Sequence, residues 1–280
     1  MNVFKFKCVP FECGGKCCNG ATHVTAKELK RFYDKAPVTF MLHFFTEENV
    51  RKTKRDFIKK SGVPFKMFVN GEEVKLYAVG EFLIGSLKDE KCVFLTEEGL
   101  CGVHGEKPLN CKAVPFNAFV PYGEMESVFN DWLKRGYPCT NRPEGKIIWN
   151  RKKPYKVDDK SFSDAYFAYR KALKENVPFT FAILSLFERT GSFPVEIFNS
   201  ETFVRFGDAK IGVVIFPSES LFKTVDIDVK DFVEKQIKIL SKTYGEENGE
   251  LKCEDEVLRA QYTIYKDFLK DSKTENIAKQ

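Results

Sequence analysis

Cysteine is concentrated in the first half of this chain, and that concentration limits what the chain can fold into more than any other feature. Eight of the nine cysteines lie there: Cys8, Cys13, Cys17, Cys18, Cys92, Cys101, Cys111 and Cys139. Thiolates are soft anionic ligands for zinc and iron, and the glycines at positions 14 and 15 allow a short loop to wrap around an ion. We therefore predict that these eight residues bind metal. Cys253 stands alone in a segment expected to be helical and is interpreted as a small buried apolar residue.

Structural disulfides are the first alternative to a metal site. Residues 1–8 show no apolar signal-peptide core and no small-residue cleavage site, so we expect a cytoplasmic protein, in which thiols stay reduced. An odd number of cysteines and the adjacent pair Cys17 and Cys18 also fit a disulfide framework poorly. The pattern favours metal binding over disulfide bonds.

The spacing of the cysteines indicates the kind of metal group. Structural zinc modules usually present C-x2-C pairs, because that turn directs two thiolates at one tetrahedral ion. The sequence contains no such pair; its spacings are C-x4-C-x3-C-C, then C-x8-C-x9-C, then a distant cysteine. Wider loops suit a larger group. We therefore expect an iron–sulfur cluster, of the [4Fe-4S] type, with zinc as the alternative.

Three motifs give the chain a family resemblance over about residues 3–140. The opening array ends in Cys17-Cys18, a Cys-Val-Phe-Leu stretch begins at Cys92, and Lys107-Pro-Leu-Asn-Cys111 leads to Pro115-Phe116. This combination resembles the cysteine-cluster family described as zinc- or iron-chelating proteins. Two positions depart from its usual pattern, because Lys107 replaces an arginine and His104 stands where a tyrosine is common. Neither change removes a cysteine.

Within that family, the C-x4-C-x3-C-C opening resembles the flagellin lysine N-methylase branch more than the branch with C-x2-C-x2-C-C. That resemblance implies a protein-lysine N-methyltransferase that uses S-adenosylmethionine and acts on flagellin or another filament protein. The alternative, from a different class, is a non-catalytic iron–sulfur or zinc protein, a carrier or interaction module stabilised by its metal. The sequence carries no complete methyl-donor motif, so no catalytic residue is assigned.

Length and charge exclude other classes of protein. A chain of 280 residues can bury a sizeable core, and no apolar run approaches the length that spans a membrane. The formal net charge of +5 is spread among interleaved acidic and basic residues, which predicts a solvated mixed surface rather than a nucleic-acid interface. The sequence also lacks G-x-G-x-x-G and P-loop motifs. The C-x3-C-x2-C loop common in radical S-adenosylmethionine enzymes is incomplete, because position 20 is glycine.

The order of predicted elements indicates an α+β fold. We expect a cysteine-rich metal-binding domain of hairpins and short helices at residues 1–150, and a mainly helical domain at 151–280, with the basic stretch at 150–154 as the boundary. In the first domain we predict a helix after the capping box of Thr25 and Glu28, helices at 46–62 and 131–135, a hairpin of 65–69 with 74–79 turning at Asn70-Gly71, and a hairpin of 92–95 with 100–103. In the second we predict helices at 162–173, 179–187, 229–240 and 257–269, and a buried strand at 211–216.

The remaining polar and aromatic residues receive structural interpretations. His23, His43 and His104 are too scattered for a catalytic triad, and each is expected to be structural, although His104 is close enough to Cys101 to be a ligand or to support one. The aromatic run of Tyr166, Phe167 and Tyr169 is expected in the core face of a helix, with a lysine- or cofactor-binding pocket as the alternative.

Overall fold

The fold is mixed α+β, as predicted. A computed structural model describes residues 3–18, 20–53, 55–69, 71–86, 91–151 and 157–278. Its strands are β1 (Val3–Phe6), β2 (Thr22–Val24), β3 (Val38–Thr46), β4 (Val63–Val69), β5 (Glu72–Ile84), β6 (Lys146–Asn150), β7 (Asp208–Val213), β8 (Glu246–Glu247) and β9 (Glu250–Leu251).

Helices connect and cover these strands. The α-helices are α1 (Pro10–Cys13), α2 (Ala26–Leu29), α3 (Glu47–Lys52), α4 (Asp56–Ser61), α5 (Leu109–Ala113), α6 (Glu126–Lys134), α7 (Ser161–Ala172), α8 (Val177–Thr190), α9 (Glu201–Phe206), α10 (Glu219–Lys223), α11 (Val229–Tyr244) and α12 (Glu256–Ala278). Short 3-10 helices are η1 (His104–Glu106), η2 (Tyr122–Glu124), η3 (Leu173–Asn176) and η4 (Val195–Asn199). No helix among the described residues has both the length and the apolar character needed to cross a bilayer.

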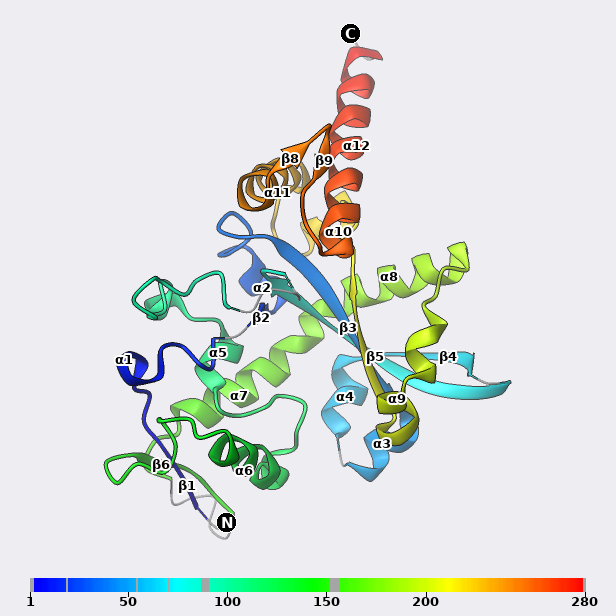
Figure 1. The fold of residues 1–280 in the computed structure, drawn as a ribbon. Helices are drawn as coiled ribbons and strands as arrows, with labels where there is room; N and C mark the ends of the chain where they lie inside the picture. The colour runs from blue at the N-terminus through cyan, green and yellow to red at the C-terminus, as the bar shows by residue number, and fades with distance from the viewer. Residues whose placement is uncertain are drawn as a thin grey trace.

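An antiparallel sheet organises the molecule. Its strand order is β2-β5-β3-β7, and β4 pairs with β5 beyond the end of β2. Figure 1 shows β3 and β5 running through the middle of the molecule, with α11 and α12 toward one end and β1, β6 and α6 toward the other. The edge strand β7 comes from the second half of the chain, whereas the other four come from the first. The predicted division at residue 150 stays a prediction.

Both faces of this sheet are covered, which explains why residues 78–84 of β5 are buried without interruption. Alternate residues of a strand point to opposite faces. On one face, Phe40 and Phe82 pack against Phe179 of α8 in the largest core, with ring centroids 6.4 and 4.9 Å from that of Phe179. On the other face, Val79 packs in a smaller cluster with Tyr169 of α7.

A second core surrounds the antiparallel pair β1 and β6. Phe4 of β1 stacks on Phe129 of α6 with ring centroids 4.2 Å apart. Trp149 of β6 is buried beside them, and its indole Nε1–H donates a hydrogen bond to the carbonyl of Tyr122 at 3.0 Å. Cys139 belongs to this apolar cluster. The start of the chain is thereby fixed next to the segment that follows α6.

Several predicted elements are confirmed. The first hairpin is β4 and β5, with Val69 opposite Glu72, and Asn70 of its predicted turn lies outside the described residues. The capping box at Thr25 begins α2, and the Asp228 carboxylate caps α11 by accepting a hydrogen bond from the amide of Asp231 at 2.8 Å. The helices expected in the second half correspond to α7, α8, α11 and α12, and the predicted strand at 211–216 overlaps β7.

Other elements differ from the prediction. The helix expected at 46–62 is divided into α3 and α4, because Thr53 ends α3 and its hydroxyl donates to the carbonyl of Asn49 at 2.6 Å. The predicted hairpin at 92–103 is instead a tight loop. Leu95 and Cys101 form an isolated antiparallel β-bridge there, and residues 92–103 form no β-strand. The short helix expected at 131–135 begins earlier, as α6. Strands β1, β2, β3, β6, β8 and β9 were not predicted.

Two buried glutamines complete the backbone hydrogen bonding at the start of β3. The amide N–H of Val38 donates to Gln236 Oε1 at 2.8 Å, and the Val38 carbonyl accepts from Gln261 Nε2 at 2.6 Å. Gln236 Nε2 also donates to the carbonyl of Tyr33 at 2.6 Å. A buried backbone group without a partner is costly, so these side chains attach α11 and α12 to the sheet.

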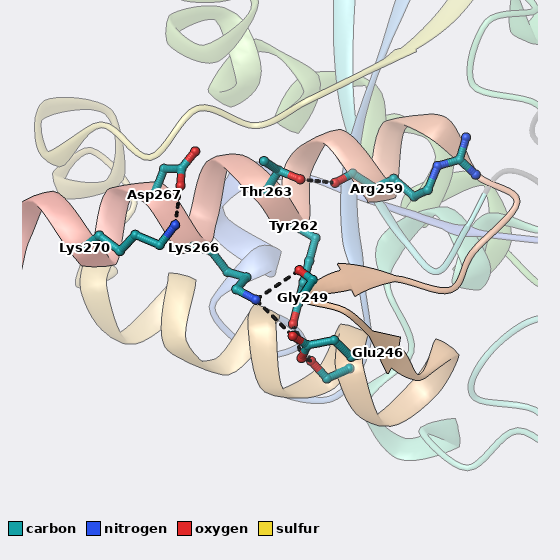
Figure 2. A network of polar contacts seen from close by, with 9 residues as sticks. Glu246, Gly249, Arg259, Tyr262, Thr263, Lys266, Asp267 and Lys270 are labelled. Atoms are coloured by element: carbon teal, nitrogen blue, oxygen red, sulfur yellow. Dashed lines mark hydrogen bonds and ion pairs between the residues drawn. The ribbon is translucent and has the colours of Figure 1, made fainter.

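The C-terminal helix is held by a polar network beside the small β8–β9 hairpin. Lys266 Nζ donates to Glu246 Oε1 at 2.9 Å and to the carbonyl of Gly249 at 3.0 Å, and the Tyr262 hydroxyl donates to Glu246 Oε2 at 2.6 Å. Figure 2 shows these side chains of α12 meeting the hairpin at one point. The network anchors α12 against the element that precedes it.

Replacement of Gln236 by leucine should destabilise the protein. Leucine fills a similar volume but leaves the Val38 N–H and the Tyr33 carbonyl without their buried partner, so we expect the free energy of unfolding to fall by about 2–4 kcal/mol. Urea denaturation measures this change. The control is Lys238→Leu at an exposed position of the same helix, expected within about 0.5 kcal/mol of wild type. Equal losses in the two variants would contradict the role assigned to Gln236.

Candidate metal centre

Four separate segments carry the clustered cysteines. Cys8, Cys13, Cys17 and Cys18 lie on and around α1, directly after β1. Cys92 and Cys101 lie on the loop between β5 and η1, Cys111 lies in α5, and Cys139 lies in the turn between α6 and β6. The cysteines that line one space come from distant parts of the sequence, so their arrangement depends on the folding of the whole first half of the chain.

Six of the eight cysteines face one cavity. The cavity has a volume of about 560 Å³, and its walls include Cys8, Cys17, Cys18, Cys92, Cys101 and Cys111. The predicted convergence of the N-terminal array with the later group is therefore observed for these six. Within the described residues, which include all eight cysteines, no three sulfur atoms lie within 4.8 Å of one another. The sulfurs are distributed around the cavity rather than drawn to one point.

Close backbone contact docks the two main cysteine loops on each other. The amide of Cys92 donates to the carbonyl of Cys18 at 2.9 Å. A Cβ at Gly15 would lie 2.6 Å from Leu95 Cδ1, and one at Gly99 would lie 3.2 Å from the Gly14 Cα. Gly15 and Gly99 also have positive φ, at +73° and +75°. Glycine is required at both positions because a side chain would separate the loops.

Cys13 and Cys139 are buried and are not part of the cavity wall. The carbonyl of Cys139 accepts a hydrogen bond from the amide of Lys7 at 3.0 Å, which holds this turn against the segment carrying Cys8. Burial is the main cause that raises the pKa of the Cys139 thiol to about 11; a backbone hydrogen bond opposes this shift, and the charges of Cys13 and Cys8 add to it. The assignment of all eight cysteines as metal ligands stays a prediction, and these two residues lie outside the cavity wall.

Comparison with known protein families assigns the segment that carries the clustered cysteines. Residues 7–140 match the CxxCxxCC family, described as "Putative zinc- or iron-chelating domain". This segment is a CxxCxxCC domain. It contains all eight clustered cysteines, and the match supports metal binding by zinc or iron. No curated protein and no solved structure matches the chain.

Polar groups surround the cysteines of the CxxCxxCC domain, and the sequence had indicated only some of them. Thr22 Oγ1 lies 3.1 Å from Cys92 Sγ, and the amide of Phe94 donates to the same sulfur at 3.5 Å. Lys107 and His104 line the cavity, so the two departures from the usual family pattern both lie at the site. The position of Thr22 at the start of β2 gave no indication of this contact in the sequence, since Thr22 and Cys92 are 70 residues apart.

Gathering thiols in one cavity changes their acidity. Burial, and then the charges of neighbouring thiolates with Cys92 first, raises the pKa of Cys111 to about 12. A hydrogen bond from Cys17 lowers the pKa of Cys18 to about 6; burial opposes this shift, and the charge of Lys107 assists it. The same hydrogen bond raises the pKa of the Cys17 thiol. Mutual repulsion among thiolates is what a bound cation offsets, because ligand binding and proton release are coupled.

Four residues outside the cavity can now be placed. Tyr166 and Tyr169 are fully buried in the packing of α7, which confirms the core interpretation for them and removes the pocket alternative. Phe167 of the same helix is 51% exposed, so the prediction that it lies in the core is wrong. Cys253 lies in the turn before α12 rather than in a helix, is half-buried, and its sulfur accepts a hydrogen bond from the amide of Asp255 at 3.4 Å. Cys253 therefore lies outside the cysteine-lined cavity.

Replacement of Cys92 by serine should remove metal, whereas the same change at Cys253 should not. Cys92 faces the cavity, and its sulfur contacts the Thr22 hydroxyl and accepts a hydrogen bond from the Phe94 amide. Its loss therefore removes a ligand together with the folding energy linked to the metal. Metal analysis of the purified variants measures the effect. We expect less than half the wild-type metal content in Cys92→Ser and wild-type content in Cys253→Ser. Equal metal loss in both variants would overturn the assignment.

Proposed function

We propose that the CxxCxxCC domain binds an iron–sulfur cluster in the cavity lined by six cysteines, with a single zinc ion as the alternative. The observation that supports this proposal is the spread of the sulfur atoms around a space of about 560 Å³. A tetrahedral zinc with Zn–S distances of about 2.3 Å draws its sulfurs to about 3.8 Å from one another. An iron–sulfur cluster is broader than one ion and accepts ligands that stand farther apart.

Hydrogen bonding at the cavity supports the same choice. Iron–sulfur clusters are tuned by hydrogen bonds to their sulfur atoms, and the Cys92 sulfur already has the Thr22 hydroxyl and the Phe94 amide as neighbours at 3.1 and 3.5 Å. The glycines at 14 and 15 let the loop that carries Cys17 and Cys18 pack closely against Leu95 and Gly99 of the loop that carries Cys92 and Cys101. These features give a metal group polar contacts beyond its direct ligands.

Anaerobic purification followed by iron, sulfide and zinc analysis tests the cluster. We expect about four iron and about four sulfide per chain, and a broad visible absorption that bleaches on chemical reduction. Full occupancy by zinc without sulfide would contradict the proposal. Cys253→Ser is the matched control, because it removes a thiol outside the cavity and should keep the absorption of the wild-type protein.

A second candidate function is protein-lysine methylation, supported by the C-x4-C-x3-C-C spacing at residues 8–18. In that reaction the neutral amine of a lysine on flagellin or another filament protein attacks the methyl group of S-adenosylmethionine. The new N–C bond forms as the S–C bond breaks, sulfur keeps the electron pair, and the amine loses a proton. The cluster-bearing domain would position the partner protein.

The methylation proposal is tested by incubating the cluster-loaded protein with S-adenosylmethionine and purified flagellin. Mass spectrometry should show a gain of one methyl mass on lysine residues, and the gain should be absent with Cys92→Ser protein that has lost its cluster. Calorimetry measures binding of the methyl donor directly. Unmodified lysines together with no binding of S-adenosylmethionine would leave the non-catalytic metal-binding protein as the function of the chain.

A further inference from the structure

A group of two histidines and one glutamate lies on the sheet, outside the set of cysteines. Strand pairing places His23 of β2 opposite Leu83 of β5, and His43 of β3 opposite Val79 of β5. Leu83 and Val79 flank Glu81 at two-residue intervals, so their side chains and those paired with them share its face of the sheet. The register therefore directs His23, His43 and Glu81 to one point from three strands.

The polar atoms of this group are close enough to share an ion. His23 Nδ1 lies 3.1 Å and His43 Nε2 lies 2.6 Å from the same carboxylate oxygen, Oε2 of Glu81. All three potential ligand atoms lie within 4.8 Å of one another. The Glu81 side chain is only 1% exposed, and its other oxygen accepts a hydrogen bond from the Tyr169 hydroxyl. One oxygen is thus oriented by Tyr169 while the other faces both imidazoles.

The approach of His43 to Glu81 is not that of an ordinary hydrogen bond. His43 Nε2 is buried and has no hydrogen-bond partner of acceptable geometry, although the carboxylate oxygen is 2.6 Å away. An imidazole nitrogen that makes no hydrogen bond can direct its lone pair elsewhere. Phe119 stacks on the His43 ring with centroids 4.5 Å apart and fixes its orientation. Nitrogen and oxygen are therefore held close together, and they would need to move apart only from 2.6 Å to about 3.3 Å to become two ligands of one tetrahedral cation.

We propose that His23, His43 and Glu81 bind a divalent transition-metal ion, zinc or ferrous iron, at a site separate from the cysteine cavity. Two imidazoles and one carboxylate are a common ligand set for both ions, and a set of only three protein ligands leaves coordination positions open. The three residues line a cavity of about 580 Å³ whose lining also includes Asn117 and Asp131. The open positions face this space, where a small molecule with an oxygen or nitrogen donor can bind.

The two sites are neighbours with different chemistry. His23 and Asn110 line both cavities, and Thr22, the residue before His23, contacts the Cys92 sulfur at 3.1 Å. Because consecutive residues of a strand face opposite ways, β2 presents Thr22 to the cysteines and His23 to Glu81. Thiolates select softer metal groups than imidazole and carboxylate do, so each site can be occupied while the other is not.

Metal titration of the full-length protein, purified with its cysteine site loaded, tests the proposal. Equilibrium dialysis against Zn²⁺ should add one ion per chain above the metal already present. With Co²⁺ as the probe, X-ray absorption of the added ion should show nitrogen and oxygen neighbours and no sulfur. An added ion with sulfur neighbours, or no ion added at saturation, would overturn the proposal.

Matched variants locate the added ion. We expect Glu81→Gln to weaken Zn²⁺ binding more than about 100-fold and Tyr169→Phe to weaken it about 10- to 100-fold, since Tyr169 only orients the carboxylate. Glu73→Gln, the same change at an exposed position of β5, should bind as wild type. Wild-type affinity in Glu81→Gln would refute the site.

Two further measurements keep the test independent of folding and of the cluster. Zn²⁺ should raise the melting temperature of the wild-type and Glu73→Gln proteins but not that of Glu81→Gln, because only a native site can bind it. Cys92→Ser should lose the cluster metal and still take up the added ion. Loss of the added ion in Cys92→Ser with an intact fold would place it at the cysteines and reject a separate site.

Discussion

Strand β5 is the element on which the rest of the structure depends. It pairs with β2, β3 and β4, and its two buried faces separate the aromatic core around Phe82 from the polar group around Glu81. A shift of its register by one residue would exchange these faces and place a carboxylate among phenylalanine rings. The buried charge then would lack its histidine neighbours, which is a severe cost. The pairing of this one strand fixes both the core and the chemistry of the sheet.

The cysteine cavity depends on the sheet less directly. Its cysteines lie on loops and on the short helix α5, and the loops are brought together by the Cys92–Cys18 backbone contact and by Gly15 and Gly99. Loops of this kind gain order from a metal as well as from packing. The second core around β1 and β6 positions the first cysteines, while β2 joins the cavity to the sheet. The site is thus assembled from parts that pack separately.

Sequence reasoning predicted the features that residue type and local spacing determine. Cysteine type and number indicated the metal site, and the capping residues Thr25 and Asp228 indicated helix starts. The approach of His23, His43 and Glu81 could not be predicted, because it depends on the register of three strands far apart in the chain. Strand β3 is buried along nearly its whole length and shows no alternation of polar and apolar residues, so no periodic signal marked it.

The pairing of β3 with β7 has a consequence for how the chain is made. β3 ends at Thr46 and β7 begins at Asp208, 162 residues later, which at ~5–20 residues per second takes roughly ten to thirty seconds of synthesis. During that interval the apolar β3 presents an unpaired edge, the kind of edge that recruits strands from other chains. A nascent chain therefore carries its complete cysteine array before its sheet can close. A fragment that ends at residue 140 would keep that edge open permanently.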